Sequence, residues 1–376
     1  MQVTSCFSFF FAFVISFSAR AISVDESWIR VRIFENLKLV QIQGAGLEIV
    51  NKAELFRGVS VTKRPINFLE IQFQKKWNHG FLLIKNDRAS SELKSESVFL
   101  KGDGLSVAAR SVGDFLQLYK RPNGFDVIVY VRLRDYLRGV VSAEVPVSWP
   151  EETLKAQIVA ARSYVLFMSE RRKALVFDVE ASIKDQVYKH TTDTRLEPLL
   201  EATKDLVLFD QHKNIFKAYY HSECGGQTSS AKRVFGDTQF DAEVKDPYCQ
   251  GRVWRLKTSK NEIERYFGTF KQLVNTFNPR GRAYAITVEK PDLTREQWSA
   301  QDLRMKIGST RMKSTWFEAR VVGNQVEFVG KGYGHGVGLC QWGSRQMGLM
   351  KKSFRDILSF YYPGAVLKKV ASERLI

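Results

Sequence analysis

Glu144 is the carboxylate whose sequence neighbours most favour proton transfer. It stands in the stretch "LRGVVSAEVPVSWP", where we expect it between the end of a strand and a turn that opens a helix. Val145, Pro146 and Trp149 would partly desolvate it and raise its pKa, which keeps some of it protonated near neutral pH. Such an acid can donate a proton to a leaving-group oxygen. The structural alternative is that Glu144 accepts a hydrogen bond from a backbone amide at the turn.

A second candidate is the glycine-rich stretch "GKGYGHGVGLCQWG", residues 330–343. Its six glycines permit positive φ angles and close backbone approach to a ligand. His335, Gln341 and Trp342 add a titratable ring, an amide and a stacking surface. No Lys-Ser or Lys-Thr follows the glycines, so the stretch does not match a phosphate-binding loop. It favours one wall of a groove for a polar, ring-shaped ligand.

Cysteines form a third candidate, because His221 and Cys224 in "AYYHSECGGQT" have H-x2-C spacing. Cys249 and Cys340 could complete a zinc site. Two ligands at a suitable spacing are a weak signal, and a Cys224 to Cys249 disulfide or unpaired thiols remain alternatives. We therefore expect no metal and no cofactor.

The element that must position Glu144 is a helix predicted over residues 150–171. Ser148 and Glu151 have capping-box spacing, and Pro150 falls in the first turn. Lys155 and Arg162 are two helical turns apart and share one face, which is either solvated or directed at a ligand. Apolar residues recur at helical spacing on another face: Leu154, Ile158, Ala161, Val165 and Met168.

The rest of the chain predicts an α+β fold. Short alternating segments separated by turn residues predict antiparallel β structure over residues 28–115. Residues 205–210 and 215–222 resemble a hairpin, residues 261–277 resemble a helix, and residues 283–289 and 315–332 resemble strands.

Charge and the N-terminus indicate where the protein acts. The chain has 376 residues and a formal net charge of +17, which implies an anionic partner: nucleic acid, anionic lipid or an anionic cell-wall polymer. No nucleic-acid-binding motif is found, so we expect no nucleic-acid partner.

Residues 1–21 contain an apolar run and an A-x-A pattern, which predict a secretory signal peptide and no transmembrane anchor. The alternative is a buried N-terminal strand. We expect an exported protein of the periplasm or cell wall, and export would remove Cys6.

Four motifs in order resemble the stage II sporulation protein D (SpoIID/LytB) family over residues 123–367. They are "YLRGVVSAEVP…LKAQIVAARSY", "AYYHSECGGQT", "RMKIGSTRMKSTWFEAR" and "GYGHGVGLCQWGSRQMG…ILSFYYPGA". Residues 22–120, which the alternating pattern predicts as a β-rich N-terminal region, lie outside these motifs. The resemblance implies a mixed α/β catalytic domain with a glycan-binding groove over residues 121–368, and residues 253–325 would form a β-rich and helical subdomain of it.

The family implies a peptidoglycan lytic transglycosylase, a lyase that cleaves the MurNAc-GlcNAc bond and leaves 1,6-anhydroMurNAc ends. The alternative is a non-catalytic wall-binding enhancer of an amidase. The partners would be glycan strands, including strands denuded by an amidase, and the amidase itself. Some relatives bind zinc in the segment after the helix, but "FDVEASIKDQVYKH" has no cysteine and should lack that site. The family's catalytic glutamate corresponds to Glu144, and its substrate-binding positions correspond to Gln157, Arg162, Tyr164, Ser222, Cys224, His335 and Gln341.

Overall fold

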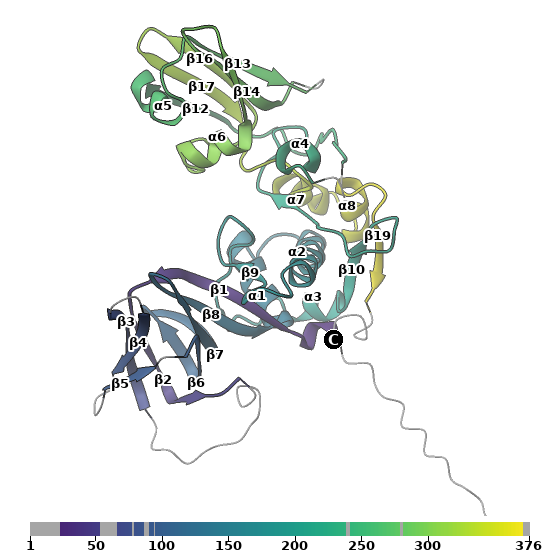
Figure 1. The fold of residues 1–376 in the computed structure, drawn as a ribbon. Helices are drawn as coiled ribbons and strands as arrows, with labels where there is room; N and C mark the ends of the chain where they lie inside the picture. Colours follow the sequence, from purple (N-terminus) through teal and green to yellow (C-terminus); the bar gives the residue numbers. More distant parts are fainter. Residues whose placement is uncertain are drawn as a thin grey trace, which may run out of the picture.

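The computed structural model describes residues 23–52, 66–76, 79–85, 90–93, 95–237, 241–278 and 281–370. The expected signal peptide, residues 1–21, lies outside these ranges. The chain forms a large N-terminal sheet, a helical centre and a pair of small sheets, which follow one another along the molecule (Figure 1). The fold is α+β, as predicted. No helix in the described residues is long and apolar enough to cross a membrane.

The large sheet has nine strands in the order β5-β4-β3-β2-β6-β7-β8-β1-β9. All neighbours are antiparallel except β1 and β9. The sheet includes β8 and β9, so it extends past residue 120, where the sequence suggested a boundary. The strands are β1 (Trp28–Leu37), β2 (Leu39–Val50), β3 (Ile66–Lys76), β4 (His79–Lys85), β5 (Ser90–Leu93), β6 (Ser97–Val107), β7 (Arg110–Arg121), β8 (Gly124–Arg132) and β9 (Val179–Glu180).

Helix α1 (Leu133–Glu144) follows β8 directly, so Glu144 ends a helix and the expectation of a strand end is wrong. Tyr136, Leu137 and Val140 explain the difference, because they lie on one helical face and are fully buried in the main core.

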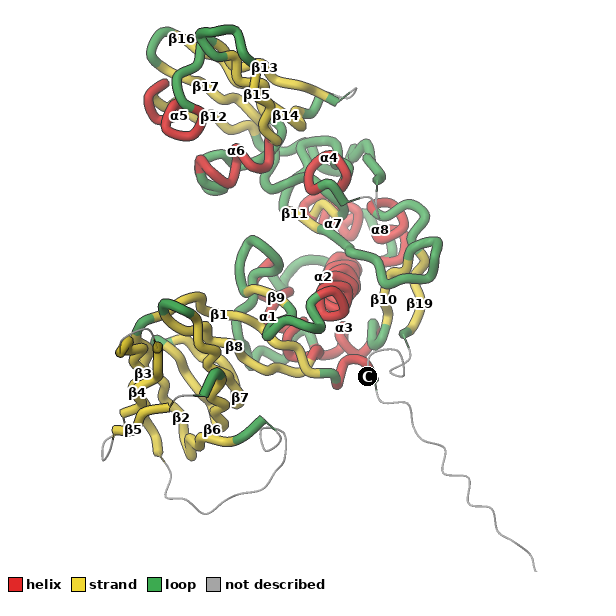
Figure 2. The backbone as a smooth tube through the Cα atoms, in the orientation of Figure 1, coloured by secondary structure: helices red, strands yellow, loops and turns green. Residues whose placement is uncertain are grey.

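Helix α2 (Glu151–Arg171) confirms the predicted helix and occupies the centre of the molecule (Figure 2). All five predicted core positions are buried, and the helix is covered on nearly every side. The predicted capping box is wrong, because Pro150 is the N-cap and no side chain caps the first turn. Lys155 pairs with Glu152, whereas Arg162 is completely buried, so the two basic residues share no solvated face.

Short elements surround α2 and connect it to the glycine-rich stretch. β10 pairs with β19 in an antiparallel manner, and β11 pairs with β18 in a parallel manner. The predicted hairpin is reduced to one bridge between Phe209 and Ile215. These elements are η1 (Val24–Glu26), α3 (Glu197–Ala202), β10 (Leu206–Phe209), β11 (Tyr220–His221), α4 (Ala231–Phe235), β18 (Leu339–Cys340), α7 (Gln341–Leu349), α8 (Phe354–Tyr361) and β19 (Val366–Lys369).

Residues 253–331 contain two three-stranded sheets with their own apolar core, ordered β12-β17-β16 and β13-β14-β15. The predicted helix over residues 261–277 is correct only to Phe267. Gly268 ends it with a φ of 72°, and a strand follows. The elements are β12 (Val253–Ser259), α5 (Lys260–Phe267), β13 (Gln272–Phe277), β14 (Ala283–Glu289), β15 (Arg295–Ser299), α6 (Ala300–Ile307), β16 (Phe317–Val322) and β17 (Gln325–Lys331).

Candidate functional site

Two neutral donors hold the carboxylate of Glu144. Oε1 accepts from the backbone N–H of Val187 at 3.1 Å, and Oε2 accepts from Nε2 of Gln341 at 3.3 Å. Burial raises the pKa of Glu144 above its usual value, and the two hydrogen bonds only partly oppose this effect. Within the described ranges no lysine or arginine forms an ion pair with it. The predicted direction of the pKa shift is therefore confirmed.

The glycine-rich stretch brings Gln341 to this position. β18 runs beside β11, with Tyr220 opposite Leu339, and α7 begins at Gln341. Gly338 has a φ of 70°, and a Cβ there would stand 2.0 Å from the carbonyl oxygen of Tyr219. The close approach predicted for the glycines therefore occurs here between two backbone segments of the protein.

The second donor, Val187, comes from a segment without regular secondary structure. Its neighbour Gln186 fixes this segment, because Oε1 accepts from the hydroxyl of Tyr136 at 2.8 Å and Nε2 lies 3.0 Å from the hydroxyl of Tyr220. Gln186 is 1% exposed. No spacing pattern marks this glutamine in the sequence, so sequence reasoning missed both residues.

A cleft of about 350 Å³ opens beside Gln186 and Tyr220. The Tyr164 hydroxyl donates to Oδ1 of Asp185 at 3.0 Å, and Asp185 also pairs with Arg172 at 2.5 Å. Aromatic faces beside hydroxyl, amine and carboxylate groups suit a polar ligand with ring-shaped units. Residues lining the cleft include Tyr164, Asp185, Lys217, Tyr219, Tyr220 and His335.

Two tryptophans form a surface next to the segments that carry Glu144 and Gln341. The Trp149 and Trp342 rings meet edge to face with centroids 5.4 Å apart. The guanidinium carbon of Arg345 lies 5.8 Å and 5.5 Å from the two ring centroids, and that of Arg252 lies 5.3 Å from Trp342. Trp342 is 38% exposed, so it is available to stack on a ligand.

Three of the predicted binding residues lie either beside Glu144 or at the cleft. Gln341 contacts Glu144, and Tyr164 and His335 line the cleft. Nδ1 of His335 lies 3.0 Å from the backbone nitrogen of Val337. Burial and neighbouring positive groups hold the pKa of His335 well below its usual value, so its ring is neutral at neutral pH.

The other predicted binding residues lie elsewhere or contact the protein. Arg162 is fully buried and its guanidinium pairs with Asp25, and Cys224 is fully buried among other cysteines. Gln157 is 1% exposed, and neither polar atom of its side chain has a hydrogen-bond partner among the described residues. Ser222 is partly exposed, and its carbonyl oxygen accepts from the Trp342 N–H at 3.1 Å.

Comparison with known proteins identifies relatives for this chain. The SpoIID family model, described as stage II sporulation protein, matches residues 121–209. An uncharacterized protein of Brachyspira hyodysenteriae is 30% identical over 72% of the chain and 76% of its own length. Stage II sporulation protein D of Bacillus subtilis is 25% identical over 76% of the chain and 88% of its own length. An amidase enhancer of the same species is 27% identical over 61% of the chain and 40% of its own length.

Proposed function

Because the chain belongs to the stage II sporulation protein D family, we propose that it is a peptidoglycan lytic transglycosylase with Glu144 as its single acid and base. Family membership and the similarity to an amidase enhancer support a role at the cell wall. The observation that carries the proposal is the environment of Glu144: a partly buried carboxylate with a raised pKa and two neutral donors. The cleft is lined by Tyr220, whose hydroxyl contacts Gln186 next to the donor Val187.

The reaction needs one group that first gives and then takes a proton. Protonated Glu144 donates to the glycosidic oxygen between N-acetylmuramic acid and N-acetylglucosamine, and the C1–O bond breaks. The C6 hydroxyl of the same muramic acid attacks C1, and its proton passes to Glu144. The C1–O6 bond completes the 1,6-anhydro product, no water is consumed, and Glu144 is again protonated.

A single acid is consistent with the surroundings of the two carboxylates that line the cleft, Asp185 and Asp237. Ordinary glycoside hydrolysis uses two carboxyl groups, one of which acts as nucleophile or general base. Asp185 accepts from the Tyr164 hydroxyl and the backbone N–H of Glu180 and pairs with Arg172. With its oxygens engaged in this way, Asp185 is a structural group. Asp237 accepts from the Tyr219 hydroxyl at 2.9 Å. In the proposed reaction the substrate's own hydroxyl serves as the nucleophile.

The surroundings of the acid support a glycan ligand. The aromatic residues at the cleft and the exposed Trp342 offer faces on which sugar rings can stack. The net charge of +17 favours attachment to a wall rich in peptide carboxylates. An exported location in the periplasm or cell wall belongs to this proposal.

Mass spectrometry of soluble products from purified sacculi tests the reaction. Intact and amidase-stripped sacculi are treated with wild type, Glu144→Gln or the control Asp185→Asn. We expect 1,6-anhydroMurNAc ends from wild type and from folded Asp185→Asn, and a loss of at least about 10²-fold in Glu144→Gln, since general acid–base catalysis contributes about 10²–10⁴-fold. Reducing ends in place of anhydro ends would indicate a hydrolase and overturn the proposal.

A second candidate, a non-catalytic enhancer of an amidase, is favoured by the similarity to the Bacillus subtilis amidase enhancer. It predicts no glycan products from either kind of sacculus, and faster release of stem peptides when the chain is added to a wall amidase. Under this alternative Glu144→Gln enhances as well as wild type does. The same two sacculus preparations therefore separate the two functions.

A further inference from the structure

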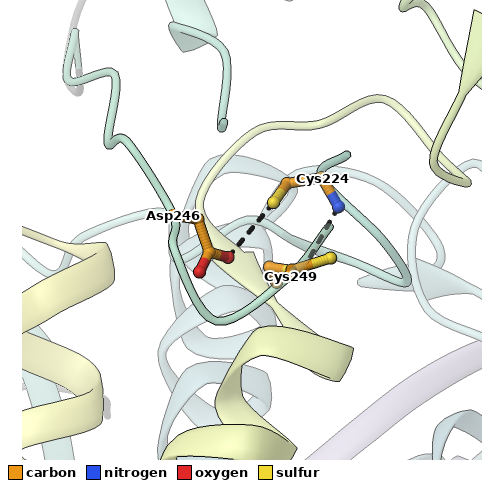
Figure 3. A group of neighbouring side chains, drawn as sticks. Cys224, Asp246 and Cys249 are labelled. Carbon is orange, nitrogen blue, oxygen red and sulfur yellow. Dashed lines mark hydrogen bonds between the residues drawn. The ribbon is translucent and has the colours of Figure 1, made fainter. Parts of the chain in front are cut away.

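Three cysteines and one aspartate that are far apart in sequence meet in the interior of the protein. One ligand atom from each of Cys224, Asp246, Cys249 and Cys340 lies within 4.8 Å of all the others. Exposed fractions are 0%, 2%, 5% and 0%, respectively. Figure 3 shows the sulfur of Cys224 facing the carboxylate of Asp246, with the side chain of Cys249 beside them. None of the three cysteines is in a disulfide.

We propose that these four side chains bind one zinc ion in a structural site. Thiolate sulfurs and a carboxylate oxygen are ordinary zinc ligands, and four of them at tetrahedral positions complete a closed structural site. At a Zn–S distance of about 2.3 Å, ligands at the corners of a tetrahedron stand about 3.8 Å apart. Atoms already within 4.8 Å of one another therefore need only small side-chain movements to contact one ion.

The spacing of the ligands and the backbone hydrogen bonds to their sulfur atoms support this assignment. Asp246 and Cys249 are three residues apart in "DPYC", a spacing found between paired ligands of structural zinc sites. Sulfur atoms accept backbone hydrogen bonds: Cys340 Sγ from the N–H groups of Cys224 and Gly343, at 3.3 and 3.4 Å, and Cys224 Sγ from Gly226 at 3.4 Å. Such second-layer donors orient metal ligands and stabilise thiolates.

Hydrogen bonds from the protein also fix the carboxylate of Asp246. Its Oδ2 accepts from the Tyr361 hydroxyl at 2.8 Å, and its Oδ1 accepts from the Tyr248 N–H at 2.9 Å. A Cβ at Gly343 would stand 2.4 Å from Oδ2, so only glycine leaves room for the carboxylate here. The carboxylate is fixed with Oδ2 facing the sulfurs, at 3.1 Å from Cys224 Sγ.

A buried cation offsets the charge of the occupied site. Three thiolates and one carboxylate around Zn²⁺ carry a net charge of about −2, which is unfavourable in the interior unless it is compensated. Arg282 is 1% exposed, and its Nη1 donates to the carbonyl oxygens of Cys224 and Gln227 at 2.9 and 2.8 Å. Its guanidinium thus lies against the backbone of one proposed ligand.

The zinc ion would join the loop after β11, the loop before β12 and the start of α7. Cys340 directly precedes Gln341, the donor to Glu144, so the metal would also fix one wall of the candidate active site. His221 is not a ligand, although H-x2-C spacing suggested it. Its Nδ1 lies 3.0 Å from the carbonyl oxygen of Val337, outside the cluster.

Metal analysis of the full chain, purified without chelators, tests the proposal. We expect about one zinc per chain, its loss in Cys249→Ser and weakened retention in Asp246→Asn. His221→Gln is the control and should keep its zinc. A metal-free chain that also fails to bind added Zn²⁺, or a chain that holds iron or copper in place of zinc, would overturn the assignment.

Two measurements on the wild-type chain keep the test decisive if a variant fails to fold. After removal of zinc, Co²⁺ should give the strong visible bands of a tetrahedral ion and a near-ultraviolet thiolate-to-cobalt band. Counting thiols in the denatured, unreduced chain should find every cysteine free. A weak octahedral cobalt spectrum, or two missing thiols from a Cys224 to Cys249 disulfide, would refute the site.

Discussion

Two carboxylates, the fully buried Asp25 and the partly buried Glu144, differ in the partners they meet. Asp25 receives the guanidinium of Arg162 through two hydrogen bonds, 2.8 Å from Nε to Oδ1 and 3.0 Å from Nη2 to Oδ2. Glu144 receives only a backbone N–H and an amide. Burial raises the pKa of both groups, and at Asp25 the arginine opposes this effect with a full charge.

The presence of Arg162 beside Asp25, and of neutral donors alone beside Glu144, distinguishes a structural carboxylate from the proposed catalytic acid. A buried carboxylate with an opposite charge beside it joins two elements, here η1 and α2. A partly buried carboxylate with neutral donors and a raised pKa, such as Glu144, keeps access to its protonated form, which is what proton transfer requires.

The largest effect is expected from Arg162→Met. The variant leaves Asp25 buried without its cation, and breaking a buried pair on one side costs about 3–5 kcal/mol. Urea denaturation at neutral pH should show this loss in the free energy of unfolding. Lys155→Met is the matched control on the same helix; its pair with Glu152 is partly exposed and should be worth about 1 kcal/mol or less.

A second change identifies the cause of that loss. Adding Asp25→Asn to Arg162→Met removes the uncompensated charge and should recover part of the stability. If Arg162→Met instead unfolds like wild type and only weakens glycan binding, Arg162 contacts substrate as the family resemblance implied, and the contrast with Glu144 fails.

An intermediate effect is expected from Gln341→Leu. The variant removes a donor that favours the charged form of Glu144, so the pKa of Glu144 should rise further. The alkaline limb of the pH–rate profile should move to higher pH, because the acid keeps its proton longer. One hydrogen bond to a charged group is worth about 1.5 kcal/mol, which corresponds to roughly a tenfold loss of kcat.

The exposed Gln346 lies on the same helix and supplies the control for this experiment. Gln346→Leu should leave both kcat and the pH profile unchanged. A Gln341→Leu profile that superimposes on that of wild type would mean that Gln341 does not act on Glu144.

Sequence reasoning succeeded where the evidence was local. The burial of Glu144, helix α2 and its apolar positions follow from neighbours within a few turns of the chain. Arg162 is buried because it pairs with Asp25, which is 137 residues away in the sequence. The helical pattern of residues 150–171 cannot predict this pair. Cys224 and Cys340 are likewise 116 residues apart. Gln186 lies in a segment without a hydrophobic repeat, so only the structure shows that it fixes the segment that carries Val187.

The smallest effect concerns the stability of Glu144→Gln. Burial raises the folded-state pKa of Glu144 above its unfolded value, so the folded chain takes up a proton more readily. The stability linked to this group is fully present below the unfolded pKa, near 4.3, and is lost as pH rises through the folded pKa. Above that range the wild type buries a charge that glutamine does not carry.

Glu144→Gln should therefore melt at a higher temperature than wild type near pH 8 and at the same temperature near pH 4. The glutamine oxygen can accept from Val187 while the Gln341 amide turns its own oxygen toward the new NH₂ group, so both hydrogen bonds persist. Scanning calorimetry at the two pH values makes the comparison. A variant less stable than wild type near pH 8 would mean that Glu144 stabilises the fold as a charged group, like Asp25, and that its position was not shaped for proton transfer.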